Sequence, residues 1–314
     1  MAYSSMKSHD KSKSAGKYIL GSVWQAMDGL PILGDVAKIR NGIQYEPSLQ
    51  QASQNLVSKH PRQGFRPGLV RVSDGFEPLV IRDHVYLNID SEVIYKSSKA
   101  YLFPWDSQKV ILNSIRISRG PWVVTGAPDY DGLVVNNLFH GIWPTAKLPL
   151  EVIASIVNGP VANAFMSINC TSRHNRITTL AQVPVPNFHP ESISTITALV
   201  IEYRSARLQW LAQRVPDKES ELRCREILVR IDAELLTAYD LPPRVERELL
   251  DYFAGHRRPG PVEFYRYYPD DFRPAIPLRM IISGYLQRAS AEQTLQRLPV
   301  LNDPVISKMV SELD

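Results

Sequence analysis

The chain has 314 residues, of which 44% are hydrophobic and 22% charged, and its formal net charge at pH 7 is +4. A chain of this length can bury one large core or two smaller ones, and its mildly basic charge is compatible with nucleic acid without requiring it. No stretch approaches the roughly 18–20 consecutive apolar residues of a membrane-spanning helix, so we predict no contact with a membrane.

The N-terminal segment, residues 1–29, is predicted to be a flexible basic tail. Its first 17 residues are rich in Ser and Lys, and no apolar core follows as in a secretory signal. We therefore expect a cytoplasmic protein. Cys170 and Cys224 lie far apart and have no partner at metal-binding spacing, which favours two reduced thiols, no metal and no cofactor.

Residues 30–189 are predicted to form a mainly β domain. Short β-rich runs alternate with turn residues such as Asp74-Gly75 and Gly120-Pro121. The predicted strands cover residues 68–72, 79–81, 85–89, 93–95, 109–117 and 122–125. Apolar and polar residues alternate in the second half of 109–117, which predicts a strand with one buried face.

One helix is expected inside this β domain. Apolar residues recur at helical intervals over residues 148–165, although Gly159-Pro160 should break or restart the helix. The domain ends at residues 180–186, which are too rich in proline for a central strand and are predicted to form an edge or an exit.

Residues 190–254 are predicted to be helical. Pro190 suits a first helical position, and Glu191 suits the positive end of the helix dipole. Apolar residues then recur three, four and seven positions apart on both sides of Pro216-Asp217. We therefore predict an antiparallel pair of long amphipathic helices, followed by a short helix over residues 244–253.

Residues 255–314 are dense in Pro, Arg and Tyr. We expect them to pack irregularly on the rest of the chain and to end in a short helix near residues 289–297. The predicted fold class is thus α+β: a mainly β domain, a long helical hairpin and an irregular C-terminal region.

Lysines and arginines between residues 59 and 122 are interleaved with tyrosines and tryptophans. Cations for phosphates and rings for base stacking are what a nucleic-acid surface needs. The same pattern also fits a solvated sheet face whose aromatic residues lie in the core, and the sequence leaves both interpretations open.

The sequence contains none of the common catalytic motifs. It has no GxGxxG after a strand, no P-loop, no HExxH, no GxSxG and no Asn/Asp-Pro-Pro-Tyr/Phe element of an adenine methyltransferase. Asp129 and Asp131 could serve a metal-dependent nuclease or form a turn with Gly132. The turn is the simpler interpretation, because no partner motif follows.

Residues 33–43, read Leu-Gly-Asp-Val-Ala-Lys-Ile-Arg-Asn-Gly-Ile, resemble the opening of target-recognition domains. These domains occur in type I restriction–modification specificity subunits and in TaqI-like N6-adenine DNA methyltransferases. Asn41 and Gly42 suit the tight turn of that motif, since both tolerate a left-handed backbone. Three further segments resemble the same family in the same order: residues 105–122, the helix over 148–163, and the Gln-Val-Pro-Val-Pro exit at 182–186.

The resemblance implies a non-catalytic DNA-recognition subunit that directs a separate N6-adenine methyltransferase acting on double-stranded DNA. The chain carries one recognition segment and one helical segment where a full specificity subunit has two of each. It could be a half-size specificity protein that pairs with a second copy of itself through its helices, or the detached C-terminal half of a split methyltransferase. Arginine reads guanine and Asn or Gln reads adenine in the major groove. The candidate DNA-binding residues are Arg40, Gln44, Tyr45, Arg66, Arg71, Arg116, Arg119, Arg173, His174, Asn175 and Arg176.

Two alternatives stay open. The chain could be a non-catalytic scaffold of a phage-defence complex that no longer reads sequence, or an enzyme built around Asp129 and Asp131. Sequence-dependent binding to duplex DNA separates the first alternative from the recognition subunit. Loss of turnover in Asp129→Asn or Asp131→Asn would identify the second.

Overall fold

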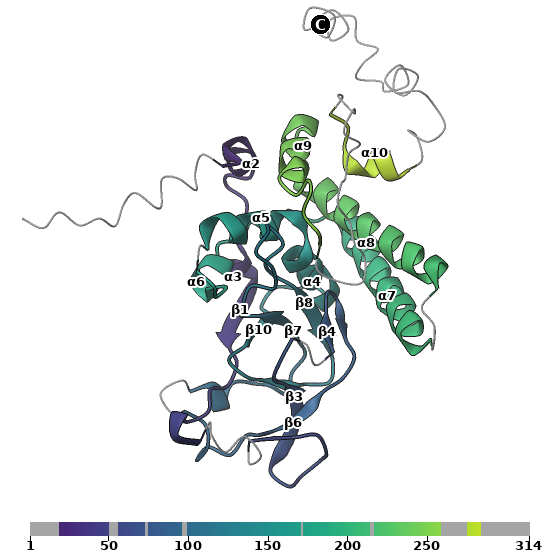
Figure 1. The fold of residues 1–314 in the computed structure, drawn as a ribbon. Coiled ribbons are helices and arrows are strands. Elements are labelled where there is room, and N and C mark those ends of the chain that lie inside the picture. The colour runs from purple at the N-terminus through teal and green to yellow at the C-terminus, as the bar shows by residue number, and fades with distance from the viewer. Residues whose placement is uncertain are drawn as a thin grey trace, which may run out of the picture.

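The computed structural model describes residues 19–49, 56–72, 75–95, 99–170, 172–213, 217–258 and 275–283. Within them the fold is α+β, as the sequence predicts (Figure 1). The helices are α2 (Gly21–Ala26), α3 (Leu33–Val36), η1 (Pro47–Leu49), η4 (Ala100–Leu102), α4 (Leu150–Asn158), α5 (Pro160–Asn169), α6 (Ile177–Leu180), α7 (Pro190–Ala212), α8 (Lys218–Tyr239), α9 (Pro243–Asp251) and α10 (Leu278–Ile282). The strands are β1 (Ala37–Asn41), β2 (Val57–Ser58), β3 (Phe65–Leu69), β4 (Phe76–Glu77), β5 (Val80–Ile81), β6 (Val85–Asn88), β7 (Lys109–Asn113), β8 (Gly126–Asp129), β9 (Val134–Val135) and β10 (Phe139–Pro144).

The central sheet is antiparallel in the order β1-β10-β7-β8. Val110 and Leu112 of β7 belong to one hydrophobic core and Ile111 to another, so the sheet is covered on both faces. All five residues of β7 are buried. The predicted alternation over 109–117 was therefore wrong: the strand ends at Asn113, and its two faces are both inside the protein.

A second sheet, β2-β6-β3-β9, and the short β4–β5 hairpin complete the β structure. The strands predicted at 68–72, 79–81 and 85–89 correspond to β3, β5 and β6 with shifted ends. Residues 122–125 are buried but not a strand, and β8 begins directly after them. At 93–95 only Ile94 pairs, through a single bridge to Tyr45.

The predicted helix over 148–165 is two helices, α4 and α5, separated by the break expected at Gly159-Pro160. Their axes differ by 52°, and a Cβ on Gly159 would come within 2.3 Å of Leu235 Cδ2. Asn163 stabilises the break by donating to the carbonyl oxygens of Val157, Asn158 and Gly159. Among the described helices, none is by itself long and apolar enough to cross a membrane; only the bent pair α4–α5 meets that test of length and composition.

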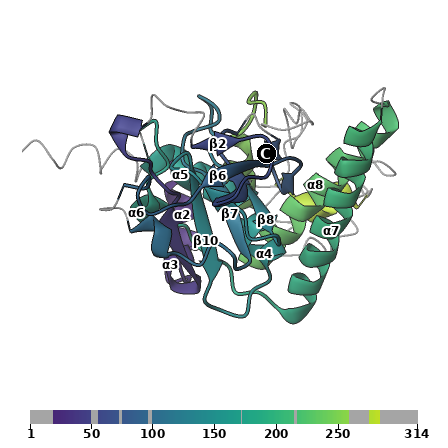
Figure 2. The ribbon, with the colours of Figure 1, turned by 90° about the horizontal axis from the view of Figure 1, so that it is seen from below.

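The helices α7 and α8 form the predicted hairpin, which lies along one side of the molecule (Figures 1 and 2). Pro190 is at the start of α7, and Asp217 caps α8 by accepting from the Ser220 amide. One hydrophobic core contains residues of the central sheet, of α4 and α5, and of the hairpin. The predicted boundary at 189/190 therefore marks a change in secondary structure and does not separate two cores.

The predicted flexible tail needs a correction at its end. Residues 1–18 lie outside the described residues, but α2 is a helix that packs against α9 and α5, with Val23 buried and Trp24 5.5 Å from Phe165. The sequence signal for this helix is weak, because α2 is only six residues long and no side chain caps its first turn. The helix predicted at 289–297 lies outside the described residues.

Candidate nucleic-acid interface

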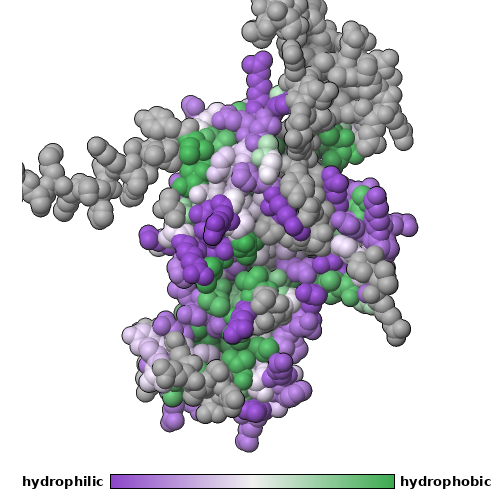
Figure 3. Space-filling view, viewed as in Figure 1, coloured by the Kyte–Doolittle hydropathy of each residue, from purple (hydrophilic) through white to green (hydrophobic). Residues whose placement is uncertain are grey.

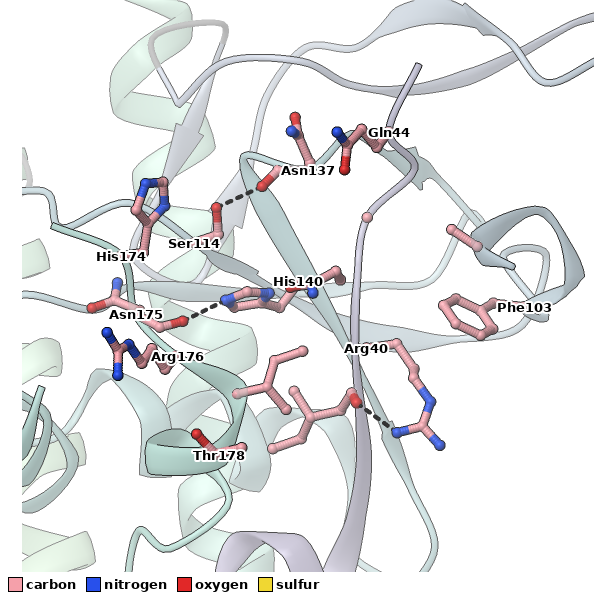
Figure 4. A pocket seen from close by; sticks show the side chains of 15 residues that line it. Arg40, Gln44, Phe103, Ser114, Asn137, His140, His174, Asn175, Arg176 and Thr178 are labelled. Carbon is pink, nitrogen blue, oxygen red and sulfur yellow. Dashed lines mark hydrogen bonds between the residues drawn. The ribbon is translucent and has the colours of Figure 1, made fainter. Parts of the chain in front are cut away.

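An open cleft of about 650 Å³ lies where the C-terminal end of β1 meets the N-terminal end of β10. It is drawn in Figure 4. Its walls come from five parts of the chain that are separate in sequence. They are residues 39–42 with Gln44, Ala100 with Phe103 at η4, Ser114, Asn137 with His140, and residues 174–178.

Pairing between strands separated by about a hundred residues creates this cleft. Asn41 of β1 pairs with His140 of β10, and His140 pairs with Leu112 of β7. The chain then continues through Gly42, whose amide donates to Phe139 O at 2.9 Å. Gly42 is required here by close approach, because a Cβ would lie 1.9 Å from Asn136 O. Neither Asn41 nor Gly42 has a positive φ, so the left-handed turn expected from the sequence was wrong.

Gly42→Ala is expected to lower the free energy of unfolding by roughly 1–3 kcal/mol, because the backbone around Asn136 must move to admit a methyl group. Chemical denaturation measures the change. Gly64→Ala is the control, because it adds backbone strain but no steric overlap. The φ of Gly64 is +80°, and a Cβ there would meet no atom within 4 Å. A Gly42→Ala protein as stable as the wild type would contradict this account.

Residues 172–176 form a loop that is fixed by its backbone and presents its charged side chains outward. The Asn175 amide donates to Ser114 O at 2.8 Å, and the Arg116 amide donates to Arg173 O at 3.0 Å. The Asn175 side chain is 1% exposed and donates to the carbonyl oxygens of Asn113 and Val123, both at 3.2 Å. Arg173, His174 and Arg176 are exposed. A surface loop held in this way can present side chains to a ligand with little loss of backbone entropy on binding.

His140 supports this loop from below. Its Nε2 lies 2.7 Å from Asn175 O, and the ring is only 3% exposed. Burial lowers the pKa of His140 to about 4, although the hydrogen bond to Asn175 opposes the shift. The imidazole is therefore neutral at pH 7, with its proton on Nε2, where it donates to the carbonyl oxygen.

The chemistry of the cleft is cationic and rich in amides. None of the fifteen lining residues is Asp or Glu. Arg40 and Arg176 supply guanidinium groups, and Asn41, Gln44 and Asn137 supply carboxamides. Such groups form paired hydrogen bonds with base edges and contact phosphates.

The structure brings five of the eleven candidate residues together in the cleft. They are Arg40, Gln44, His174, Asn175 and Arg176. Arg173 and Arg116 belong to the same loop network, with Arg116 Nη1 donating to Cys170 O at 3.3 Å. Arg66 pairs with Asp106 at 3.6 Å on β3, Arg71 is exposed after β3, and Arg119 is exposed before Gly120; none of these three lines the cleft.

Two candidates prove to be structural. Tyr45 is 9% exposed, and its hydroxyl donates to Leu56 O at 3.1 Å, so its ring belongs to the core and not to a DNA surface. Burial raises the pKa of its hydroxyl. Asn175 uses its side-chain amide inside the protein. The interleaved pattern over 59–122 also includes core residues, because Trp105, Trp122 and Lys109 are buried.

Sequence reasoning did not include Asn41, Asn137, Ser114 and Phe103 among the binding candidates. Asn137 follows another asparagine before β10, a weak signal that many turns share. These residues come from separate segments, and only the folded chain brings them around one cleft.

The alternative active site at Asp129 and Asp131 is not supported. Asp129 is fully buried, and its Oδ2 lies 2.5 Å from Lys109 Nζ. Its oxygens also accept from the amides of Asp131 and Leu133. In the part of the chain that the structure describes, no group of three His, Cys, Asp or Glu residues is arranged to hold a metal.

No protein-family model and no curated protein matches the chain. Its structural neighbours are restriction–modification proteins. The type IIL restriction–modification enzyme MmeI, solved in complex with DNA, is 10% identical with a TM-score of 0.42, over 72% of this chain and 35% of that chain. A chain from a type I restriction–modification system is 13% identical with a TM-score of 0.39, and the match covers 73% of this chain and 53% of that chain.

The HsdS subunit from Thermoanaerobacter tengcongensis is 15% identical with a TM-score of 0.36, over 73% of this chain and 52% of that chain. The chain thus spans between about a third and about half of the length of these three proteins.

Proposed function

We propose that this chain is a sequence-specific DNA-recognition subunit that directs a separate N6-adenine DNA methyltransferase in a restriction–modification or related defence system. The observation that carries the proposal is the cleft, which guanidinium and carboxamide side chains line without a carboxylate. The resemblance of residues 33–43 to target-recognition domains also supports it, because these residues form α3 and β1, and the segment 39–42 lines the cleft.

The arrangement of the cleft suits major-groove reading. Arg40 and Arg176 could each pair with the O6 and N7 atoms of a guanine, and Gln44 or Asn137 with an adenine. Figure 4 shows Gln44 and Asn137 on one side of the opening and His174 on the other. Side chains on the fixed 172–176 loop and on the strand β1 would meet the same few base pairs.

The partner methyltransferase would bind the helical hairpin. The surface of α7 and α8 is mostly hydrophilic in Figure 3, but Ile201, Leu208 and Leu222 are 54%, 42% and 44% exposed. Exposed apolar side chains on a helix pair offer a contact for another subunit. A second copy of the chain is the competing occupant of this surface, and the mass of the assembled complex in solution distinguishes the two.

The decisive experiment is selection from a randomised duplex library by the purified chain, alone and with the methyltransferase encoded beside it, at two salt concentrations. We expect enrichment of a defined motif that contains adenine. Binding that lacks any motif and disappears at higher salt, even with the partner present, would overturn the proposal and favour a scaffold.

Arg176→Gln is expected to weaken binding to the selected site by about 5- to 150-fold, the equivalent of the 1–3 kcal/mol of one bidentate base contact. It should also relax selection at one base pair. Arg244→Gln is the matched control, because Arg244 is exposed on α9 and does not line the cleft. A loss in Arg176→Gln that is the same for every DNA sequence would indicate that Arg176 contacts phosphate only.

A further inference from the structure

We propose that the hollow of the cleft receives one nucleotide extruded from the bound duplex, with its base stacked on the Phe103 ring beside the Arg40 guanidinium. This inference rests on the proposed function and assigns a ligand to the same site. A pocket that holds an extruded nucleotide needs an aromatic or apolar surface for the base and polar groups for the edge of the base. The cleft contains both.

The shape of the site is the first observation. The cleft has a volume of about 650 Å³, which is in the range of pockets that enclose most of the surface of a small ligand. The major groove of DNA admits projecting elements, such as a helix or a β-ribbon. Exposed side chains of the cleft, such as Arg176 and Asn137, can project in this way. The hollow between them can be filled only by a group that projects from the DNA.

The lining of the hollow suits a flat, uncharged ring. Ile39, Ala100 and Ser114 line it and are buried, and the Ser114 hydroxyl already donates to Asn137 O at 2.7 Å. The charged side chains of the cleft, Arg40 and Arg176, are exposed. Buried apolar groups below and exposed cations above favour a base inside the hollow and phosphates outside it.

Phe103 supplies a stacking surface in this hollow. Its ring is partly buried and lines the cleft. The rings of Trp105 and Trp143 lie 6.1 and 6.3 Å from it, at interplanar angles of 53° and 65°. They support the ring, but neither stacks on it in parallel. A parallel aromatic partner, such as a base, is therefore the contact that these neighbours do not supply.

Arg40 forms the opposite side of this stacking surface. Figure 4 shows Arg40 and Phe103 on the same side of β1, and the guanidinium lies over the ring at 6.0 Å from its centroid. Arg207 lies much closer to the ring of Trp210, at 4.3 Å. A base between Arg40 and Phe103 needs about 7 Å, twice the ~3.4 Å between stacked bases. A small movement of the exposed Arg40 side chain admits it, and guanidinium planes stack on bases as rings do.

The test removes single bases from the selected site and uses the assembly that enriched this site. Extrusion costs least when a base has no pairing partner. Removal of the opposing base should therefore tighten wild-type binding at the extruded position, by about tenfold or more. At positions that stay in the stack, the same removal should weaken binding or leave it unchanged.

Phe103→Leu keeps an apolar side chain but removes the ring. We expect it to weaken binding to the intact site by about 5- to 150-fold, the contribution of one base–aromatic stack. The loss should disappear for the duplex that lacks the extruded base itself, and Phe103→Tyr should restore most of the affinity. Phe65→Leu is the matched control and should bind as the wild type does. Phe65 also has a guanidinium over its ring, that of Arg62 at 5.9 Å, but does not line the cleft.

Three results would overturn the inference. The first is that removal of the opposing base tightens wild-type binding at no position. The second is a loss in Phe103→Leu that is the same for every duplex. The third is a tightened position at which Phe103→Leu binds as the wild type does, which would assign the extrusion to the methyltransferase. If the wild type enriches no motif at all, the proposed function itself fails, and that failure is visible before any base is removed.

Discussion

Asp129→Asn is expected to lower the free energy of unfolding by about 3–5 kcal/mol, because it leaves the Lys109 ammonium group buried without its counter-ion. Both side chains are fully buried, and their charged atoms lie 2.5 Å apart. Lys109 also donates to Trp105 O, and Asp129 accepts from the Leu133 amide. In the wild type both charged groups of this pair therefore have hydrogen-bond partners. Burial already lowers the pKa of Lys109, against the opposing effect of Asp129.

Urea denaturation at pH 7 measures this loss. Asp131→Asn is the matched control, two residues along the chain and exposed, and should change stability by less than about 0.5 kcal/mol. The double variant Lys109→Met/Asp129→Asn should recover most of the loss, because it removes the stranded cation. A stable Asp129→Asn protein would show that Lys109 is not buried as a cation.

The second large effect is a pH dependence caused by His140. Its folded pKa of about 4 lies below the ordinary value of 6.5, so the unfolded chain binds a proton that the folded protein excludes. Its contribution to stability is complete above pH 6.5 and is lost as the pH falls from 6.5 to about 4. At 1.36 kcal/mol per pKa unit, the total loss is about 3 kcal/mol.

His140→Gln isolates this contribution, because glutamine can donate to Asn175 O but cannot titrate near neutrality. We expect the unfolding free energies of the wild type and His140→Gln to converge or cross as the pH falls below 6.5. His174 is exposed on the 172–176 loop and its charge lowers the pKa of His140 by less than burial does, so His174→Gln should keep most of the wild-type pH dependence. If the plots of unfolding free energy against pH are parallel for the wild type and His140→Gln, the pKa of His140 does not differ between the folded and unfolded protein.

The pairing of β1 with β10 explains why the candidate site could be predicted only in part. The type of each candidate, arginine or carboxamide, is visible in the sequence, and Arg40, Gln44 and Arg176 were predicted from it and line the cleft. Asn137 was missed because its neighbours in the chain say nothing of residue 40, with which it lines one cleft only after folding. Tyr45 and Asn175 were expected at the surface for the same reason: the Tyr45 hydroxyl and the Asn175 side-chain NH₂ donate to backbone oxygens elsewhere in the chain.

The sequence by itself determined the elements whose signals are local. The stripes over 190–212 and 218–239, the stop near Asp217 and the break at Gly159-Pro160 follow from side-chain spacing and from the backbone limits of proline and glycine.

The tertiary structure decided which strands are buried on both faces, which carboxylate is paired and which histidine is neutral. Those properties depend on the desolvation of a side chain by residues far away in the chain. In this protein, long-range packing around one sheet therefore separates the structural polar residues from those left exposed at the surface.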